Sequence, residues 1–172
     1  MGVLPNLFPG YQEVTDPAVR AKFAAAWGID PALMDDQVGT RITEVPHKAL
    51  TGEIKAYYIM GEDPLQTEAV LGLVRKGIEA LDFVVVQDIF MTKTAEMADV
   101  LLPATSWGEH GGVFTCADRG FQRFEQAIPP AGNVKRDWEI ISLLASELGY
   151  PMHYENNQQI WDEMRELCPL FY

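Results

Sequence analysis

The run Phe83-Val84-Val85-Val86 is the feature that most limits how this chain can fold. Four consecutive apolar residues without alternation are typical of a strand that is covered on both faces. A β-rich run at residues 54–60 precedes it, and Val100-Leu101-Leu102 follows it, just before Pro103. With helical patterns between these runs, the order β-α-β-α-β predicts a parallel sheet with right-handed crossovers.

Helix signals separate the three runs. Asp63 and Pro64 form a capping residue followed by proline at the first helical position, and Gln66 completes a capping-box pattern. A short helix is also expected from Thr92 or Thr94 to Ala98. The helix after Asp63 is expected to carry an apolar face formed by Val70, Val74, Ile78 and Leu81.

The remaining segments are arranged around this core. Asp16 is expected to cap a first helix that Gly28 ends, and Asp137 to cap a later one. The predicted fold class is α/β: a three-layer, Rossmann-like parallel-sheet domain with a C-terminal helical and irregular extension. The predicted division is an N-terminal arm and helix at 1–40, the α/β core at 41–104, loops and two short strands at 105–135, and C-terminal helices at 136–172.

The charge of the chain limits its partners. It has 13 Lys and Arg residues against 25 Asp and Glu, so the net charge is −12, which disfavours an electrostatic grip on nucleic acid or anionic membranes. No apolar run approaches the roughly 18–20 residues of a membrane span, and the first residues lack the basic region of a signal peptide. We therefore expect a soluble cytoplasmic protein with no nucleic-acid partner and no membrane insertion.

The loops that follow the three predicted strands are candidate binding segments, because ligands of open parallel sheets bind beyond the carboxyl ends of the strands. These loops lie at residues 61–64, 87–88 and 104–106. A helix N-terminus suits a phosphate, but the acidic first loop is better matched to ribose hydroxyls or to the N–H edge of a guanine. Asp88 and Asp137 could act in the same way. Alternatively, Asp63 and Asp137 are only helix caps.

Other motifs do not amount to an active site. Glu109 and His110 could form an acid/base pair, but neighbouring loop residues need not face one site. Cys116, Cys168 and three scattered histidines lack the spacing of metal ligands, so no catalytic or metal-binding residue is predicted. One basic cluster is either a contact for a phosphate or partner or a solvated face: Arg119, Arg123, Lys135 and Arg136.

A series of motifs carries a family resemblance over essentially the whole chain. They are Tyr58-Ile59-Met60-Gly61-Glu62-Asp63-Pro64, Val86-Gln87-Asp88-Ile89-Phe90-Met91-Thr92-Lys93-Thr94-Ala95, Ala98-Asp99-Val100-Leu101-Leu102-Pro103, Trp107-Gly108-Glu109-His110, Gly112-Val113-Phe114-Thr115, Asp118-Arg119-Gly120-Phe121-Gln122-Arg123 and Asp137-Trp138. In this order they resemble the molybdopterin oxidoreductase family. The opening Pro5-Asn6-Leu7-Phe8-Pro9-Gly10-Tyr11-Gln12 is similar to formate dehydrogenase catalytic (alpha) subunits of the H type.

The resemblance implies a segment of a larger enzyme. Catalytic chains of this family are several times longer, with a four-cysteine cluster motif and a metal-ligating cysteine or selenocysteine that cannot be placed here. The parent would oxidise formate to carbon dioxide and pass electrons to an iron–sulfur cluster; the segment alone would be inactive. Its cofactors would be bis(molybdopterin guanine dinucleotide) with molybdenum or tungsten, and a 4Fe-4S cluster that this segment does not ligate. Its partners would be the remaining domains of the parent chain and electron-transfer subunits.

The resemblance also implies which residues bind the cofactor. These are Gly61, Glu62, Asp63 and Thr67 for the nucleotide end, Gln87 and Asp88 for the guanosine, Ser106 for a phosphate and Asp137 for the guanine edge. Residues 105–135 would return toward the cluster domain. Gly111 and Cys116 depart from the family pattern, in which Glu and Asn are frequent at these positions.

Two alternatives stay open. The first is a related segment of a nitrate reductase or of a respiratory-complex subunit, although the opening residues favour the formate type. The second is a standalone nucleotide-binding or interaction module.

Overall fold

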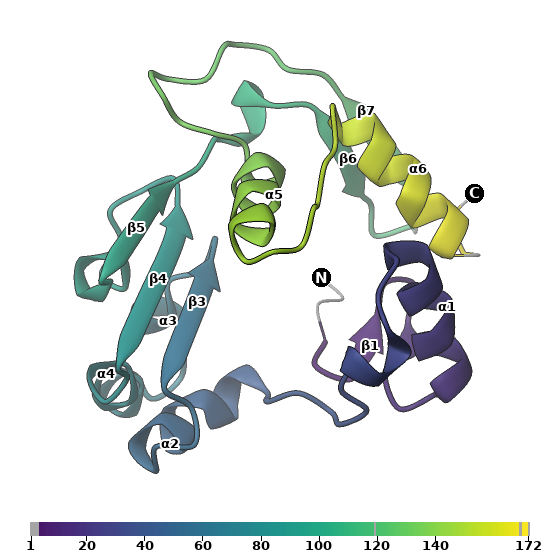
Figure 1. The fold of residues 1–172 in the computed structure, drawn as a ribbon. Coiled ribbons are helices and arrows are strands. Elements are labelled where there is room, and N and C mark those ends of the chain that lie inside the picture. Colours follow the sequence, from purple (N-terminus) through teal and green to yellow (C-terminus); the bar gives the residue numbers. More distant parts are fainter. Residues whose placement is uncertain (1–3, 119, 169, 172) are drawn as a thin grey trace. The chain divides into compact units, whose positions relative to one another are not determined.

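The computed structural model describes residues 4–118, 120–168 and 170–171, which form two compact units. The first unit contains the described residues up to Ile42 together with those from Gln158 onward, and the second is Thr43–Asn157. Figure 1 follows the chain through both. Among the described residues, no helix has both the length and the apolar character that a membrane crossing requires.

The first unit begins with a small hairpin where the sequence suggested an irregular arm. Strand β1 (Leu7–Phe8) pairs antiparallel with β2 (Gln12–Glu13). The turn between them places Gly10 at φ 76° and Tyr11 at φ 60°, a pair of positive values that lets two strands reverse direction tightly. Residues other than glycine rarely adopt a positive φ, so a tyrosine at this position gives little sign of a hairpin in the sequence.

Two helices complete the first unit. Helix α1 (Pro17–Trp27) begins at Asp16, whose carboxylate accepts a hydrogen bond from the amide of Ala18 at 2.8 Å, and it ends at Gly28 with φ 64°. Both ends were predicted. Helix α6 (Asn157–Leu167) is the predicted last helix. A small core forms around three buried residues from these elements: Phe23, Leu167 and Cys168.

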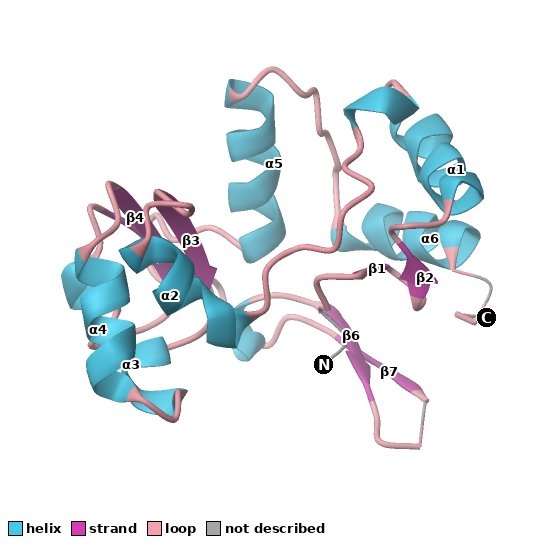
Figure 2. Cartoon of the chain, turned by 90° about the horizontal axis from the view of Figure 1, so that it is seen from below, coloured by secondary structure: helices cyan, strands magenta, loops and turns pink. Residues whose placement is uncertain are grey.

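The second unit is built on a three-stranded parallel sheet in the order β3-β4-β5 (Figure 1). Figure 2 shows two of its strands, β3 and β4, side by side. Its strands are β3 (Ala56–Met60), β4 (Phe83–Asp88) and β5 (Val100–Pro103). Val86 of β4 lies opposite Ile59 on one side and opposite Leu101 on the other. The predicted α/β class and the parallel sheet formed by these three runs are thereby confirmed.

The connection between β3 and β4 differs from its prediction, because it contains two helices where one was expected. Helix α3 (Pro64–Thr67) stops at Glu68, which is extended (ψ 152°), and α4 (Leu71–Glu79) begins three residues later. Val70 is therefore outside the helical face on which it was placed, and it is 60% exposed. The second crossover contains only a 3-10 turn at Ala95–Met97 instead of a short helix.

The two faces of the sheet are covered unequally. Along β4, Val84 and Val86 are buried, whereas Phe83 on the other face is 45% exposed. Helix α5 (Asp137–Glu147) contacts this second face through its first residue: the side chain of Asp137 accepts a hydrogen bond from the side chain of Gln87. The buried core of the first face consists of Ile59, Leu65, Val74, Ile78, Val84, Val86 and Ala95.

The segment beyond the sheet contains the two predicted short strands. Strands β6 (Gly112–Thr115) and β7 (Phe121–Phe124) pair antiparallel. The capping role predicted for Asp137 is wrong: Asp137 is the first residue of α5, and the preceding Arg136 occupies the cap position. The amide of Arg136 donates to Glu139 at 2.8 Å, so Glu139 takes over the cap and the Asp137 carboxylate is left for another contact.

Helix α2 (Val45–Leu50) packs against α4 at a glycine. A Cβ atom added at Gly77 would lie 2.6 Å from the Cα of Pro46, a distance that real atoms do not adopt. Nothing lies within 4 Å of the corresponding position at Gly72, which is on the same helix. The absence of a side chain at Gly77 is therefore what allows the two helices to approach.

We expect Gly77→Ala to destabilise the protein by roughly 1–3 kcal/mol, because α2 must shift to accept the methyl group. Gly72→Ala is the matched control, and its better helix propensity should stabilise the protein by up to about 1 kcal/mol. Urea unfolding followed by circular dichroism measures both. Equal effects of the two substitutions would contradict the close contact.

Candidate cofactor-binding site

The three loops predicted to form one binding edge do meet at the carboxyl end of the sheet. The amide of Gly61, directly after β3, donates to the carbonyl of Gln87 at 2.9 Å. The amide of Ala104, directly after β5, donates to the carbonyl of Asp88 at 3.2 Å. Gly61 adopts φ 62°, a left-handed conformation that turns the chain away from the strand. Backbone bonding therefore holds the starts of all three loops together.

Two predicted site residues from distant parts of the chain contact each other at this edge. The Gln87 side chain is 0% exposed, and its Nε2 donates to Oδ1 of Asp137 at 2.6 Å. Its Oε1 accepts a hydrogen bond from the hydroxyl of Tyr58. Tyr58 is a member of this group that sequence reasoning missed. Tyr58 lies two residues before Met60, the residue directly opposite Gln87, and it is therefore a diagonal neighbour of Gln87 on the adjacent strand; this register was the available signal.

The Tyr58 hydroxyl acts as a donor in this group. Burial raises the pKa of Tyr58, and the negative charge of Asp137 raises it further. The hydroxyl therefore stays protonated at neutral pH and can donate to the amide oxygen of Gln87.

Asp63 has a different role from the helix cap that its position suggested. Its side chain makes no cap bond to α3. Instead, Oδ1 accepts from both the amide (3.1 Å) and the hydroxyl (2.5 Å) of Thr94, and Oδ2 accepts from the side chain of Gln66. Thr94 is fully buried, and its hydroxyl oxygen accepts from the amide of Leu65 at 3.2 Å. Asp63 thus ties the loop after β3 to the segment before β5.

Burial of Asp63 on its own would raise its pKa, but hydrogen bonds from the side chains of Thr94 and Gln66 and from backbone amides of Thr94 and Lys93 outweigh burial. The pKa of Asp63 is therefore lowered in the folded protein. A carboxyl group with a lowered folded pKa contributes stability above its unfolded pKa, near 3.9, and loses that contribution as the pH falls through the folded value.

Other predicted site residues use part of their polar groups locally. Thr67 donates its hydroxyl to Oε1 of Glu62 at 2.5 Å. Oδ1 of Asp88 accepts from the amides of Ile89 (2.6 Å) and Phe90 (3.1 Å), which forms an Asx turn. Each carboxylate keeps a second oxygen that can accept a bond from a ligand.

Ser106 belongs to a local network. Its amide and hydroxyl donate to Oε2 of Glu109 at 2.8 and 3.0 Å, and the amide of Ala131 donates to Oε1 of Glu109 at 2.9 Å. Backbone bonds from Ser106 and Ala131 lower the pKa of Glu109. His110 contacts Thr105 instead, with its Nδ1 3.1 Å from the hydroxyl oxygen. Glu109 and His110 thus serve different loop contacts rather than a common acid/base pair.

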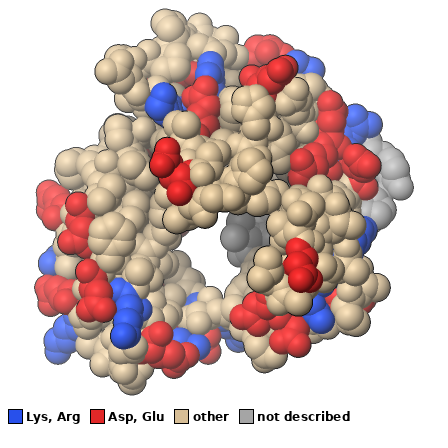
Figure 3. All heavy atoms as spheres, in the orientation of Figure 1, with Lys and Arg blue, Asp and Glu red and all other residues tan. Residues whose placement is uncertain are grey.

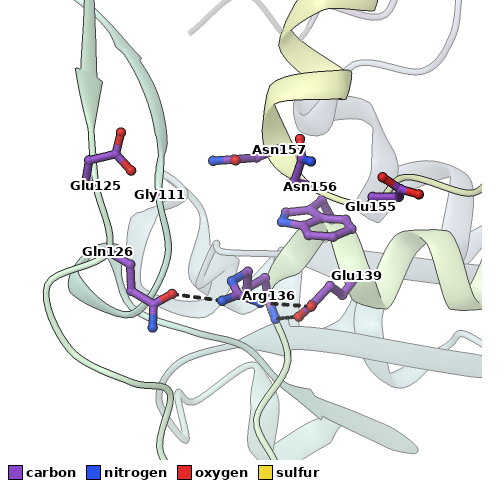
Figure 4. A pocket seen from close by; sticks show the side chains of 9 residues that line it. Gly111, Glu125, Gln126, Arg136, Glu139, Glu155, Asn156 and Asn157 are labelled. Atoms are coloured by element: carbon purple, nitrogen blue, oxygen red, sulfur yellow. Dashed lines mark hydrogen bonds and ion pairs between the residues drawn. The ribbon is translucent and has the colours of Figure 1, made fainter.

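Arg136 and its neighbours line a separate pocket, shown in Figure 4. The Arg136 guanidinium donates to Glu139 and to Gln126, both at 2.9 Å. The volume of the pocket is about 230 Å³, below the roughly 300–1,000 Å³ of typical ligand sites. The side chains of its wall come from the start of α5, the end of the β6–β7 segment and residues 155–157.

The predicted basic cluster is partly neutralised. Arg123 pairs with Glu125 at 2.8 Å and Arg136 pairs with Glu139 at 2.9 Å, while Arg119 lies outside the described residues. On the face drawn in Figure 3, basic side chains lie among acidic ones and do not form a separate patch. Arg123 and Arg136 therefore lend little attraction to a phosphate. Lys135, the remaining member of the cluster, is exposed, and its backbone forms a β-bridge with Ala104 at the carboxyl end of the sheet.

The donor and acceptor chemistry of the edge fits the nucleoside part of a cofactor. Carboxylate oxygens of Glu62, Asp88 and Asp137 only accept hydrogen bonds when ionised, which suits ribose hydroxyls and the N–H groups of a guanine. Among the residues that the structure describes, no group of three His, Cys, Asp or Glu side chains could hold a metal ion.

The sequence profile of the molybdopterin oxidoreductases matches residues 16–147, which is most of the chain. The protein therefore belongs to the molybdopterin oxidoreductase family.

Relatives within this family narrow the resemblance. Over all of its length, the chain is 62% identical to formate dehydrogenase H of Escherichia coli (strain K12), of which it covers 24%. Over 99% of its length it is 42% identical to the putative formate dehydrogenase YrhE of Bacillus subtilis and 41% identical to the F420-dependent formate dehydrogenase 2 subunit alpha of Methanococcus maripaludis. It covers 17% and 25% of these proteins. The chain thus spans a quarter or less of its relatives, and the resemblance to formate dehydrogenases of the H type is confirmed.

A solved structure supports the fold. Acetylene hydratase from Pelobacter acetylenicus matches with a TM-score of 0.66 and 23% identity, covering 89% of this chain and 22% of that one. At this identity the match bears on the arrangement of the elements alone.

The Asp63–Thr94 contact can be tested by Thr94→Val, which keeps the shape of the side chain and removes the hydroxyl. We expect the free energy of unfolding to fall by about 1–3 kcal/mol near pH 7, because the buried Asp63 carboxylate and the Leu65 amide each lose a partner. Because the lowered pKa of Asp63 depends on this contact, the difference in unfolding free energy between the variant and the unchanged protein should shrink as the pH falls below about 4. Urea unfolding at several pH values measures it. Thr115→Val, at an exposed strand position, is the control, and a pH-independent loss would contradict the assignment.

Proposed function

We propose that this chain is the segment of a formate dehydrogenase alpha subunit that binds the guanosine end of a molybdopterin guanine dinucleotide. The contact between Gln87 and Asp137, 2.6 Å long, carries the proposal. It brings an acceptor from α5 to the same edge at which the loops after β3, β4 and β5 meet. That edge is where an open parallel sheet binds its ligands.

Each predicted residue has a proposed share in this site. Asp137 accepts from the N–H edge of guanine, and Gln87 holds Asp137 in place. Glu62 and Asp88 offer their second carboxylate oxygens to ribose hydroxyls. The remaining contacts with the nucleotide end are proposed for Gly61, Asp63, Thr67 and Ser106.

The activity proposed for the longer parent protein follows from its relatives. Three relatives with formate dehydrogenase in their names match essentially the whole chain, which favours formate over nitrate as the substrate. The proposed parent would oxidise formate to carbon dioxide, with bis(molybdopterin guanine dinucleotide) and molybdenum or tungsten supplying the redox chemistry and a 4Fe-4S cluster receiving the electrons. The chain's own residues would position and electrostatically tune one of the two nucleotides.

The proposed partners are the other domains of the parent and electron-transfer subunits of a formate dehydrogenase complex. Residues 105–135, with the β6–β7 hairpin, are proposed to return toward the domain that holds the cluster. The cytoplasmic location stays a prediction.

The test of the guanosine site is calorimetric titration of the 172-residue chain with guanosine diphosphate, with adenosine diphosphate as the comparison. Saturable binding that favours guanine is expected. Asp137→Asn should weaken guanosine diphosphate binding by about tenfold or more, because a charged acceptor is lost. Asp82→Asn, which lies just before the opposite end of β4, is the matched control and should bind like the unchanged chain.

Absence of binding by a chain that unfolds cooperatively would overturn the proposal that these loops form a guanosine site by themselves. Binding that is equal for the two nucleotides would overturn the assignment of Asp137 to the base.

A further inference from the structure

The hydrogen bonds around Gln87 form a series in which each group donates to the next, from Tyr58 through Gln87 to Asp137. Gln87 is fully buried between two side chains, the Tyr58 hydroxyl on β3 and the Asp137 carboxylate on α5. A buried amide group without partners costs about 1–3 kcal/mol for each unsatisfied atom. Both ends of this amide are satisfied, and loss of the Tyr58 hydroxyl would leave the buried amide oxygen without this partner.

The chemistry of the three groups allows one orientation of the Gln87 amide. An ionised carboxylate has no proton to donate, so the NH₂ end of the amide must face Asp137. The carbonyl end must then face Tyr58, which has a proton to donate. In the reversed orientation, the amide oxygen would lie against the carboxylate oxygen and repel it. The Asp137 carboxylate therefore selects this orientation, and the Tyr58 hydroxyl stabilises it by donating to the amide oxygen of Gln87.

This series of hydrogen bonds leaves Asp137 with one carboxylate oxygen for a ligand. Oδ1 accepts from Gln87, and no hydrogen bond to Oδ2 is found within the described parts of the chain. Because Oδ1 is fixed, Oδ2 has a fixed direction as well. A guanine presents two neighbouring donors, N1–H and the 2-amino group, to such a carboxylate, whereas an adenine presents a ring acceptor at N1.

From this geometry we propose that Tyr58 is a positioning residue that sets the guanine specificity of Asp137 through Gln87. The inference rests on the proposed guanosine site and adds a residue that touches no part of the nucleotide. The effect of Tyr58 should appear as a change in the preference between two bases that differ in their hydrogen-bond donors.

The experiment compares the unchanged chain, Tyr58→Phe and Tyr57→Phe in titrations with guanosine and inosine diphosphates. Inosine keeps N1–H and lacks the 2-amino group. Tyr57 is the matched control, because it lies next to Tyr58 on β3 and packs against the core on the opposite face of the sheet. Melting curves establish that each variant is folded, and a folded Tyr58→Phe is expected because that side chain is 37% exposed.

The unchanged chain should prefer guanosine to inosine diphosphate, and Tyr57→Phe should keep this preference. In Tyr58→Phe, guanosine diphosphate binding should weaken by about tenfold and most of the preference over inosine diphosphate should disappear. A purely structural role would weaken both nucleotides equally and leave their ratio unchanged, which would overturn the inference.

The result also separates this inference from the proposed function. A chain that prefers guanosine diphosphate, with a Tyr58→Phe variant that keeps the full preference, refutes the role of Tyr58 and leaves the site. A folded, unchanged chain that binds neither nucleotide refutes both.

Discussion

The parallel pairing of β4 with both of its neighbours is the constraint on which the rest of the second unit depends. Parallel strands carry their carboxyl ends to the same edge, so the register that sets Val86 opposite Ile59 and Leu101 also brings three loops together. Backbone bonds from Gly61 and Ala104 extend this pairing into the loops. The candidate site is therefore a consequence of the strand register and requires no separate folding element.

Buried polar side chains then fix what the backbone brings together. Asp63 joins the first loop to Thr94, which lies 31 residues away along the chain, and Gln87 joins the sheet to α5 across 50 residues. Each group would be costly to bury alone, and each is paired. Since breaking either contact leaves a partner unsatisfied, both contacts select one arrangement of loops and helix from the many that apolar packing would tolerate.

Features set by local sequence were predictable, and those set by distant contacts were not. The apolar runs of the sheet and the Asp16 cap depend on neighbouring residues, and the structure has them as expected. The break between α3 and α4, by contrast, accompanies an Asp63 side chain that binds Thr94 in place of the helix amides. Within the site, the residue types at the strand ends were visible in the sequence. Tyr58 was not, because its partner lies on another strand.

The charge of the chain explains why recognition at this edge would fall on the nucleoside rather than on the phosphates. The net charge is −12, and the Arg123 and Arg136 guanidiniums are paired with glutamates. The Ser106 hydroxyl, expected to contact a phosphate, directs its proton to Glu109. Carboxylate acceptors match the N–H and O–H donors of guanosine, whereas they repel a pyrophosphate. A phosphate held near this edge would therefore have to depend on backbone N–H groups, on Lys135, whose backbone pairs with Ala104 at this edge, or on cations from other parts of a longer parent chain. Base identity would be read by the acceptors that the described chain supplies.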